Sequence, residues 1–532
     1  MIHFVKLAIA ATAVLWSSSA SAKSSRTQGT TSCASVAAPT VPGAQVLSIG
    51  GNEAHNVSVA AVPGLLGSVV TGLNVCNVTV VLTHPGANDT VTVTVWLPLQ
   101  GWNGRFQATG GGGYATGVGV LALAPAAAAG YAAAETDGGH DSNLESPSSW
   151  ALTSTGAVNW PLLTDFASRS LQDMAVVGKA VTASYYGTGP RYSYWNGCST
   201  GGRQGLMEAQ RYPDDFDGIL AASPAINWPS FIVAQQWPQV VMNVEQTFPS
   251  QCEFQAFVNA SIADCDGLDG VLDGVIADPG ECKFDPYKLV GSTILCDGSE
   301  VTISWKTADI VRKTLDGPTA PNGSKLWYGL NVGASFSGNS NTTIVNGTTV
   351  GDPFPISDTW IQYFLEKDPD YNTSSITYSK FAQLFAQSNA EYGSVIGTDN
   401  PDLSAFRAAG GKMITWHGLA DQLIFPNGTV NYYERVKREM GGATTVDDFY
   451  RLFLAPGVAH CVGGNGPAPT SPFDAVVAWV EQGKAPDTLP AKVVDTSGAT
   501  VTHDICVYPL VSRYDGKGDP KSASSYSCST SF

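Results

Sequence analysis

Basic residues are scarce in this 532-residue sequence. Lysine and arginine total 28 against 45 aspartates and glutamates, which gives a formal net charge of −17. A partner such as nucleic acid or an anionic membrane surface needs a concentrated basic patch. We therefore expect an acidic, solvated exterior, and neither nucleic acid nor a membrane as a partner.

Long apolar runs are missing after the N-terminal segment. Residues 118–134 are apolar but are interrupted by Gly119, Pro125 and Gly130. The N-terminus has a basic start, an apolar stretch over 7–16 and the small residues Ala20-Ser21-Ala22, which are typical of a secretory signal peptide. We expect residues 1–22 to be removed and the mature chain to be soluble, secreted and extracellular.

The motif CxxC is absent, which argues against zinc-binding cysteine pairs and against thioredoxin-like redox chemistry. Ten cysteines in an exported chain instead imply up to five disulfides. Nine Asn-X-Ser/Thr sequons favour a secreted eukaryotic glycoprotein whose sequon-bearing loops face solvent. The sequons stand at Asn56, Asn77, Asn88, Asn259, Asn322, Asn341, Asn346, Asn372 and Asn427.

The sequence predicts an α/β fold with a mostly parallel sheet flanked by helices. Alternating β-branched residues over 78–83 and 90–97 predict two antiparallel strands at the leading edge of the sheet. Strand and helix patterns then alternate up to about residue 224 and again after 400. Before residue 224, apolar spacing predicts a helix over 163–184. After residue 400, the patterns predict strands at 412–416 and 449–454 and helices at 429–440 and 472–482.

The middle of the chain differs from the rest in its amino-acid composition. Residues 225–400 are rich in Trp, Pro, Asn, Gly and Ser and show no repeated βα units. About 510 residues would remain after signal cleavage, which is more than one core usually organises. We expect a discontinuous catalytic domain, 23–224 and 401–532, interrupted by a lid domain over 225–400.

The segment Gly197-Cys198-Ser199-Thr200-Gly201 reads GxSxG between a predicted strand and a predicted helix. This is the nucleophile elbow of α/β-hydrolases, in which a strained turn exposes the serine hydroxyl. An ordinary turn is the alternative in a chain with 57 glycines. Four glycines at 110–113 also follow a predicted strand, and we expect Gly111 and Gly112, with Thr200, to donate N–H groups to an oxyanion. A flexible turn is the alternative there.

A nucleophilic serine needs a histidine as base, and three follow Ser199: His417, His460 and His503. His460 ends a loop after a predicted buried strand, where a catalytic base would be presented. His417 directly ends a strand, and His503 lies in what reads as an irregular tail. His460 is therefore the preferred base on position.

For the acid, Asp421 lies just beyond a predicted strand, where ligands gather in open α/β sheets. The competitors precede the strand or lie in a polar turn, and they are Asp399, Asp402, Asp447 and Asp448. The cysteines favour the same constellation, because Cys198 precedes Ser199 and Cys461 follows His460. A bond between them would set serine and histidine side by side, whereas five unrelated bridges are the alternative.

Cys198-Ser199, Asp421 and His460-Cys461 together resemble the fungal tannases and feruloyl esterases. The likeness extends over 197–205, 212–218 and 411–418. It implies a secreted carboxylic-ester hydrolase with an α/β-hydrolase fold, a Ser199-His460-Asp421 triad, and a lid that shapes an aromatic-acid pocket. It also implies that Cys198 pairs with Cys461.

The resemblance implies further disulfides. Cys252 with Cys265 would brace an acidic loop and Cys282 with Cys296 would close the next one. Cys33 with Cys76 and Cys506 with Cys528 would secure the two ends.

The acidic loop of the lid carries Asp266, Asp269 and Asp273 with glycines between them. Carboxylates on a tightly turning backbone suit Ca²⁺, although the spacing is not that of an EF-hand, and a solvated acidic turn is the alternative. The resemblance implies a structural calcium held by these side chains and by the carbonyls of Val271 and Val275, with no organic cofactor.

The leading functional interpretation is a feruloyl esterase that releases hydroxycinnamic acids from plant cell-wall esters. Its substrates would be small aromatic-acid esters, free or attached to polysaccharide. A tannase that cleaves galloyl esters shares every motif above and is the main alternative. A serine carboxypeptidase and a non-catalytic binding protein on a hydrolase scaffold are weaker ones. The sequence does not define an oligomeric state.

Overall fold

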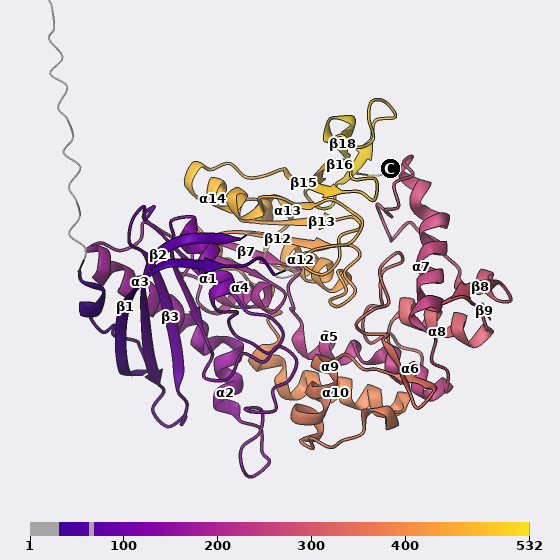
Figure 1. The fold of residues 1–532 in the computed structure, drawn as a ribbon, viewed down its shortest axis with the longest axis horizontal. Helices are drawn as coiled ribbons and strands as arrows, with labels where there is room; N and C mark the ends of the chain where they lie inside the picture. The colour runs from indigo at the N-terminus through magenta and orange to yellow at the C-terminus, as the bar shows by residue number, and fades with distance from the viewer. Residues whose placement is uncertain (1–30, 63–68, 531–532) are drawn as a thin grey trace, which may run out of the picture.

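A nine-stranded sheet forms the centre of the computed structural model, which describes residues 31–62 and 69–530 (Figure 1). The predicted signal peptide, residues 1–22, lies outside the described residues. The strand order is β1-β2-β3-β5-β4-β6-β7-β12-β13. The strands are β1 (Gln45–Val59), β2 (Val70–Thr83), β3 (Val91–Pro98), β4 (Arg105–Thr109), β5 (Ala132–Thr136), β6 (Tyr192–Cys198), β7 (Gly218–Ala222), β12 (Lys412–Gly418) and β13 (Tyr450–Ala455).

The sheet is antiparallel at its leading edge and parallel beyond it. β1, β2, β3 and β5 pair antiparallel, and every pair from β5 to β13 is parallel. The predicted strands at 78–83 and 90–97 fall in β2 and β3, and those at 412–416 and 449–454 in β12 and β13. Parallel neighbours require crossover connections, usually helices, which matches the strand–helix alternation of the sequence.

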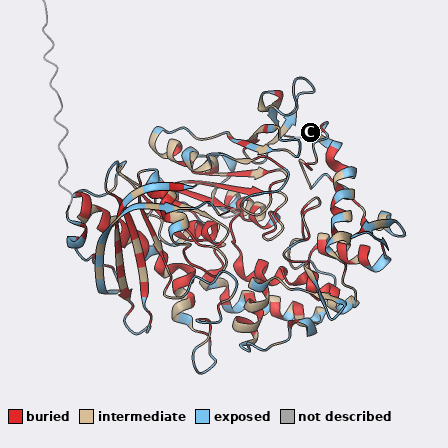
Figure 2. Cartoon of the chain, in the orientation of Figure 1, coloured by how far each residue is buried: buried red, intermediate tan, exposed pale blue. Residues whose placement is uncertain are grey.

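Helices cover both faces of the sheet, and its central strands are red in the burial view of Figure 2. Consecutive strand residues point to opposite faces. Trp195 accordingly packs in one core with residues of α3, α4 and α12, whereas Tyr194 packs in another with α14. The helices of this part are α1 (Val120–Ala128), α2 (Trp160–Thr164), α3 (Ser170–Tyr186), α4 (Thr200–Arg211), α12 (Asn427–Glu439), α13 (Ala443–Asp447) and α14 (Pro472–Gln482).

The helix predicted over 163–184 is interrupted by a π-helical turn, η2 (Asp165–Arg169), between α2 and α3. The buried guanidinium of Arg203 donates to the carbonyls of Phe166 and Ala167 at 2.9 and 2.8 Å. A π-turn leaves carbonyls displaced from the regular helical ladder, so they can accept from a side chain. Arg203 of α4 thereby binds the turn that leads into α3.

Between β7 and β12 the chain adds no strand to the main sheet. It builds a helical lobe, drawn in magenta and orange in Figure 1, whose core also takes in Trp150, Phe166 and Ile424 from outside this segment. Its elements are α5 (Trp228–Ala234), α6 (Trp237–Glu245), α7 (Gln251–Cys265), η3 (Asp266–Asp269), β8 (Thr293–Cys296), β9 (Ser299–Thr302), α8 (Trp305–Asp316), β10 (Thr342–Val345), β11 (Thr348–Gly351), α9 (Pro355–Thr359), η5 (Trp360–Glu366) and α10 (Tyr378–Ile396). The next helix, α11 (Ser404–Ala408), packs Phe406 in the core of the main sheet.

The C-terminal segment is ordered into strands, so the expectation of an irregular tail around His503 is wrong. His503 lies in β16, where it pairs with Ala491 of β15. The alternating residues of this segment bury Val501 and Ile505 against the rest of the domain. The strands are β14 (Ala468–Pro469), β15 (Thr488–Val494), β16 (Thr500–Cys506), β17 (Val511–Tyr514) and β18 (Tyr526–Ser529). No helix among the described residues has the length and hydrophobicity to span a membrane.

All ten cysteines form disulfides, but two of the expected pairings are wrong. Cys252 bonds to Cys296, and Cys265 bonds to Cys282. Cys252 and Cys265 lie at opposite ends of α7, about 20 Å apart at 1.5 Å per residue, which a disulfide cannot bridge. The other three bonds are those that the resemblance implies: Cys33–Cys76, Cys198–Cys461 and Cys506–Cys528.

Candidate active site

Ser199 stands at the turn between β6 and α4 with φ 63° and ψ −123°. A positive φ is strained for a residue with a side chain, and such strain is concentrated at functional sites. The turn is tight because its glycines leave no room for a side chain. A Cβ at Gly197 would lie 2.5 Å from the Gly201 carbonyl carbon, and one at Gly202 would lie 2.3 Å from the Ala222 carbonyl oxygen. The motif is therefore a nucleophile elbow in geometry as well as in sequence.

His460 and Asp421 are hydrogen-bonded to each other. Nδ1 of His460 lies 2.8 Å from Oδ2 of Asp421, which is fully buried. A carboxylate can only accept, so Nδ1 carries the proton and Nε2 is left with a lone pair. Asp421 follows β12 and His460 follows β13, so neighbouring parallel strands deliver both side chains to one edge of the sheet.

His417, the rival base in the sequence, also binds Asp421. Its Nε2 lies 3.0 Å from the same Oδ2 and 2.9 Å from the carbonyl oxygen of Ile424. Its Nδ1 lies 2.9 Å from the hydroxyl of Thr429. Because the carbonyl only accepts, Nε2 carries the proton and Thr429 donates to Nδ1. His417 is thus a fully buried support of the acid, a role that sequence reasoning missed although it lies four residues before Asp421.

The pKa of Asp421 is far below its ordinary value. Burial alone would raise it, but His460 and His417, through charge and hydrogen bonds, lower it by more. Its Oδ1 accepts further N–H groups from Leu423 and Ile424 at 2.9 and 2.8 Å. Asp421 therefore stays ionised. The other candidate acids of the sequence were Asp399, Asp402, Asp447 and Asp448. None of these four carboxylates is hydrogen-bonded to a histidine among the described residues.

A disulfide joins the nucleophile segment to the base segment. Cys198 and Cys461 are bonded although 263 positions separate them. Cys461 has a φ of 59°, so both Ser199 and Cys461 hold left-handed backbone beside this bond. The N–H of His460 donates to Oε1 of Gln422 at 3.2 Å. The loop that carries His460 is thus held on both sides of the imidazole.

The structure argues against two of the three expected oxyanion donors, Gly111 and Gly112. Gly111 N–H donates to Oε1 of Gln204 at 2.9 Å, and Gly112 N–H donates to the carbonyl of Ala115 at 3.1 Å. Both N–H groups already have acceptors, because the glycine segment packs against α4 and forms a turn of its own. The amides of Gly113 and Thr200 have no acceptor among the described residues.

Gly113 and Thr200 are held together beside the serine. The Thr200 hydroxyl donates to the Gly113 carbonyl at 2.7 Å. Gln204 adds a second attachment, since its Nε2 donates to the carbonyl of Thr116 at 3.0 Å while its Oε1 binds Gly111. The free N–H groups of Gly113 and Thr200 are therefore positioned by α4 next to Ser199.

A cavity opens over the serine, between the sheet and the helical lobe. Besides Ser199 and His460, its wall is largely apolar, and Gln235 is its one amide side chain. The walls come from residues around α5, from the start of α9 and from the loop after Asp421. The lining residues are Gly113, Ser199, Thr200, Ala225, Trp228, Phe231, Ile232, Gln235, Phe354, Ile356, Leu423, Ile424 and His460.

Comparison with known proteins decides the family. The profile of the family described as "Tannase and feruloyl esterase" matches residues 76–529. The chain belongs to this family. It is 50% identical over 505 residues to a probable feruloyl esterase of Arthroderma benhamiae, covering 94% of each chain. It is 32% identical over 496 residues to feruloyl esterase B of Aspergillus niger, covering 89% of this chain and 90% of the other.

Two solved structures agree with this assignment. Tannin acyl hydrolase from Aspergillus niger matches with a TM-score of 0.84 and 28% identity over 93% of this chain and 94% of the other. Feruloyl esterase B from Aspergillus oryzae matches with a TM-score of 0.76 and 30% identity over 92% and 97%. The protein has the α/β-hydrolase fold and is a carboxylic-ester hydrolase.

The predicted calcium loop follows α7. Asp266 accepts N–H groups from Gly274 and Val275, and one oxygen each of Asp269 and Asp273 accepts an N–H of the same loop. The second oxygens of Asp269 and Asp273, and the carbonyls of Val271 and Val275, have no donor among the described residues. Partial burial and the neighbouring Asp266 and Asp269 raise the pKa of Asp273 to about 6. Unused hard oxygens and unbalanced negative charge fit a Ca²⁺ ligand set.

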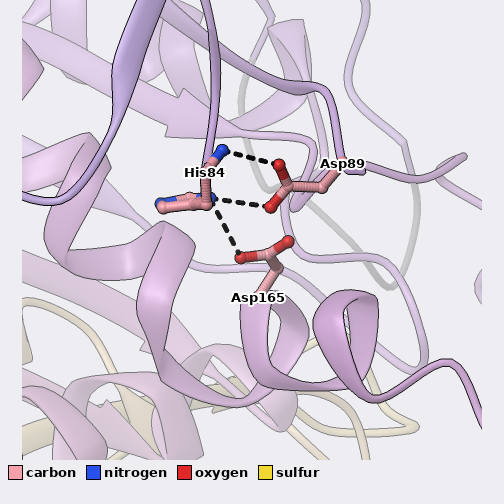
Figure 3. Close-up of side chains that lie close together, drawn as sticks. All are labelled: His84, Asp89 and Asp165. Carbon is pink, nitrogen blue, oxygen red and sulfur yellow. Dashed lines mark hydrogen bonds and ion pairs between the residues drawn. The ribbon is translucent and has the colours of Figure 1, made fainter. Parts of the chain in front are cut away.

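A second acidic group lies after β2 (Figure 3). Within the described ranges, His84, Asp89 and Asp165 form the one set of three potential ligands whose atoms all lie within 4.8 Å of one another. Arg169 already supplies a cation to it, at 2.8 Å from Asp89 and 2.6 Å from Asp165. His84 also lies 3.1 Å from Asp173. This buried group therefore ties the β2–β3 turn to η2 and α3 by ion pairs. The carboxylate oxygens of Asp266, Asp269 and Asp273 in the predicted calcium loop do not all lie within 4.8 Å of one another.

Proposed function

We propose that the protein is a secreted feruloyl esterase that hydrolyses esters of hydroxycinnamic acids, with Ser199 as nucleophile, His460 as base and Asp421 as acid. The observation that carries the proposal is the Asp421–His460 hydrogen bond beside a disulfide that joins Cys461 to the residue before Ser199. This arrangement faces a largely apolar cavity. The 50% identity to a probable feruloyl esterase supports the same activity.

The reaction begins when Nε2 of His460 removes the proton from the Ser199 hydroxyl. The serine oxygen attacks the ester carbonyl, and Asp421 stabilises the imidazolium that forms. The imidazolium then protonates the leaving alcohol as the tetrahedral intermediate collapses to an acyl-enzyme. Water, deprotonated by His460, attacks this acyl group and releases the carboxylic acid.

The oxyanion of each tetrahedral intermediate would be held by the N–H groups of Thr200 and Gly113. Both amides lie beside Ser199 and have no acceptor among the described residues. A preorganised donor of this kind is worth about 3 kcal/mol in acyl transfer. Gln204 and the Thr200 hydroxyl would keep the Gly113 segment in place.

The cavity wall favours a cinnamoyl over a galloyl group. Trp228, Phe231 and Phe354 offer flat apolar contacts, whereas a galloyl ring would bring three hydroxyls into a wall with one amide side chain. Burying a hydroxyl without a partner costs about 1–3 kcal/mol. Tannase activity remains the second candidate, because tannin acyl hydrolase from Aspergillus niger shares the fold with a TM-score of 0.84.

Hydrolysis of methyl ferulate, methyl caffeate and methyl gallate by the purified protein tests the proposal. We expect kcat/KM for methyl ferulate to exceed that for methyl gallate by about tenfold or more, as one or two unpaired hydroxyls predict. A preference for methyl gallate would establish the tannase alternative. Hydrolysis of none of the three would contradict both.

Export, glycosylation and calcium belong to the proposal. Residues 1–22 would direct secretion and be removed. Seven of the nine sequon asparagines are exposed and would carry glycans, whereas Asn77 and Asn341 are partly buried. A structural Ca²⁺ would be held by Asp266, Asp269 and Asp273 with the carbonyls of Val271 and Val275. It would neutralise the loop and draw its oxygens together.

A further inference from the structure

The helical lobe binds two carbonyl groups of the loop that carries Asp421. Nδ2 of Asn331 donates to the carbonyl oxygen of Leu419 at 3.0 Å. Nδ2 of Asn339 donates to the carbonyl oxygen of Gln422, also at 3.0 Å. Both asparagines are buried, and both belong to the lobe segment between α8 and β10. The two contacts therefore lie on opposite sides of Asp421 along the chain.

The main sheet binds N–H groups of the same loop. The N–H of Leu419 donates at 2.8 Å to the carbonyl of Ala455, the last residue of β13. The N–H of Ala420 donates at 3.0 Å to the carbonyl of Val458, in the loop after β13. Backbone groups that leave water need partners of this kind. The Asp421 loop is thus held from two directions, by acceptors near β13 and by donors from the helical lobe.

The contact of Asn339 continues to the base. Its acceptor, Gln422, has a side-chain Oε1 that accepts the N–H of His460 at 3.2 Å. The same lobe segment also packs closely on the acid loop, since a Cβ at Gly338 would lie 2.5 Å from Cδ2 of Leu423. The helical lobe is therefore connected directly to the loop of the acid and, through Gln422, to the loop of the base.

These contacts require a donor on the side chain. A carbonyl only accepts, so Nδ2 of each asparagine must face the loop. A leucine of similar size would leave the carbonyl without this partner. Oδ1 of Asn339 is buried without a partner among the described residues, so Asn339→Leu also removes an unpaired acceptor. The loss of that unpaired acceptor limits the cost of the substitution to folding.

We propose that Asn331 and Asn339 are positioning residues, which hold the Asp421 loop in the geometry that proton transfer from Ser199 to His460 needs. This inference rests on the proposed esterase function. It gives the helical lobe a role in the chemical step that is independent of the acyl group in the cavity. Moving a catalytic group by about 1 Å costs about 100-fold in rate, so two hydrogen bonds to this loop matter for turnover.

The test measures kcat and KM of Asn339→Leu and Asn331→Leu on methyl ferulate, methyl caffeate and methyl gallate. We expect kcat to fall about 10- to 100-fold on every ester that the wild type hydrolyses. KM should stay within about twofold, because substrate contacts are unchanged. The rate constant of labelling by a fluorophosphonate should fall in parallel, since this reaction also needs the activated serine. Asn339→Gln keeps an amide donor and should recover part of the lost kcat.

Asn389→Leu is the matched control. Asn389 lies on α10 of the same lobe, and its Nδ2 donates at 2.8 Å to the carbonyl of Phe385 in that helix. The variant loses an amide donor of the lobe that has no hydrogen bond to the Asp421 loop among the described residues. It should keep the wild-type kcat, KM and labelling rate. Circular dichroism spectra establish which variants are folded.

Wild-type kcat and labelling rates in folded Asn339→Leu and Asn331→Leu would overturn the inference. A change confined to KM, or a loss of kcat on one ester alone, would also overturn it, because either would assign the asparagines to substrate binding. An equal loss of kcat in Asn389→Leu would leave them a structural role only. Asn331→Leu decides the question if Asn339→Leu does not fold. A wild-type protein that neither hydrolyses the three esters nor reacts with the fluorophosphonate would instead remove the proposed function itself.

Discussion

Cys198 and Cys461 are bonded to each other, and the bond connects the residue before Ser199 to the residue after His460. Ser199 follows strand β6 and His460 follows strand β13, and two strands lie between β6 and β13 in the sheet. The disulfide therefore spans the edge at which the candidate nucleophile and base are presented.

Replacing both cysteines, Cys198→Ala with Cys461→Ala, should lower stability and turnover together. Closing a loop of this length contributes about 5 kcal/mol in the chain-entropy model, and the His460 loop loses its attachment to the elbow. We expect a lower Tm and a kcat reduced by about tenfold or more, since misplaced catalytic groups raise the activation barrier.

The double variant at Cys506 and Cys528 is the control, because that bond closes a 22-residue separation in the C-terminal segment. It should lower the Tm and leave kcat unchanged; equal kcat values in the two double variants would contradict the account.

Gln204→Leu should lower kcat more than it changes KM. The substitution removes the acceptor of the Gly111 N–H and the donor to the Thr116 carbonyl, which hold the segment carrying Gly113. We expect kcat to fall about 10- to 100-fold, part of the value of one oxyanion donor. Gln210→Leu, on the same helix but bonded to Tyr432, should have little effect on kcat. A change confined to KM would argue for a substrate contact instead.

The elbow and the proximity of Asp421 and His460 could be predicted from the sequence because each depends on local pattern. A serine between glycines at a strand-to-helix boundary, and two side chains just after buried strands, specify positions at one edge of a parallel sheet. Position already favours His460 over His417, and the cysteines and the family resemblance support the same choice.

Features that depend on long-range contacts could not be predicted. The side chain of Gln204 accepts a hydrogen bond from the Gly111 amide, which that glycine therefore cannot offer to an oxyanion. The partner of Cys252 depends on how α7 packs against the β8–β9 hairpin, and neither residue spacing nor composition encodes that contact. The second histidine on Asp421 is likewise visible only once the loop after β12 is folded.

The buried group around His84 predicts a pH-dependent stability. Burial raises the pKa of Asp165 to about 7 and that of Asp173 to about 6, despite Arg169 and His84. The folded state therefore binds more protons than the unfolded state between about pH 4 and pH 7, so stability falls as pH rises through that window, by about 1.4 kcal/mol per pH unit for each group.

Asp165→Asn should flatten this dependence. Urea unfolding at pH 5 and pH 7.5 measures it, and we expect the free energy of unfolding to fall less between the two pH values in the variant than in the wild type. Asp214→Asn, at an exposed position, is the control and should retain the wild-type slope. An identical slope in Asp165→Asn would show that Asp165 does not bind a proton in this range.

Removing calcium should destabilise the helical lobe. A ligand at 100 times its Kd adds about 2.7 kcal/mol to the stability of the folded state, so Ca²⁺ should raise the Tm and EGTA should lower it. Asp273→Asn should weaken that response, whereas Asp297→Asn, in the exposed turn of the β8–β9 hairpin, should retain it. A Tm that is the same in Ca²⁺ and in EGTA would remove calcium from the account.

Labelling by a fluorophosphonate tests the central claim, that Ser199 is a nucleophile activated by His460, most directly. The wild-type protein should gain one adduct in intact-mass spectra, located on the peptide that contains Ser199. Ser199→Ala should gain none and should lose hydrolysis of methyl ferulate while keeping its fold. An adduct on another residue, or ester hydrolysis retained by folded Ser199→Ala, would contradict the assignment.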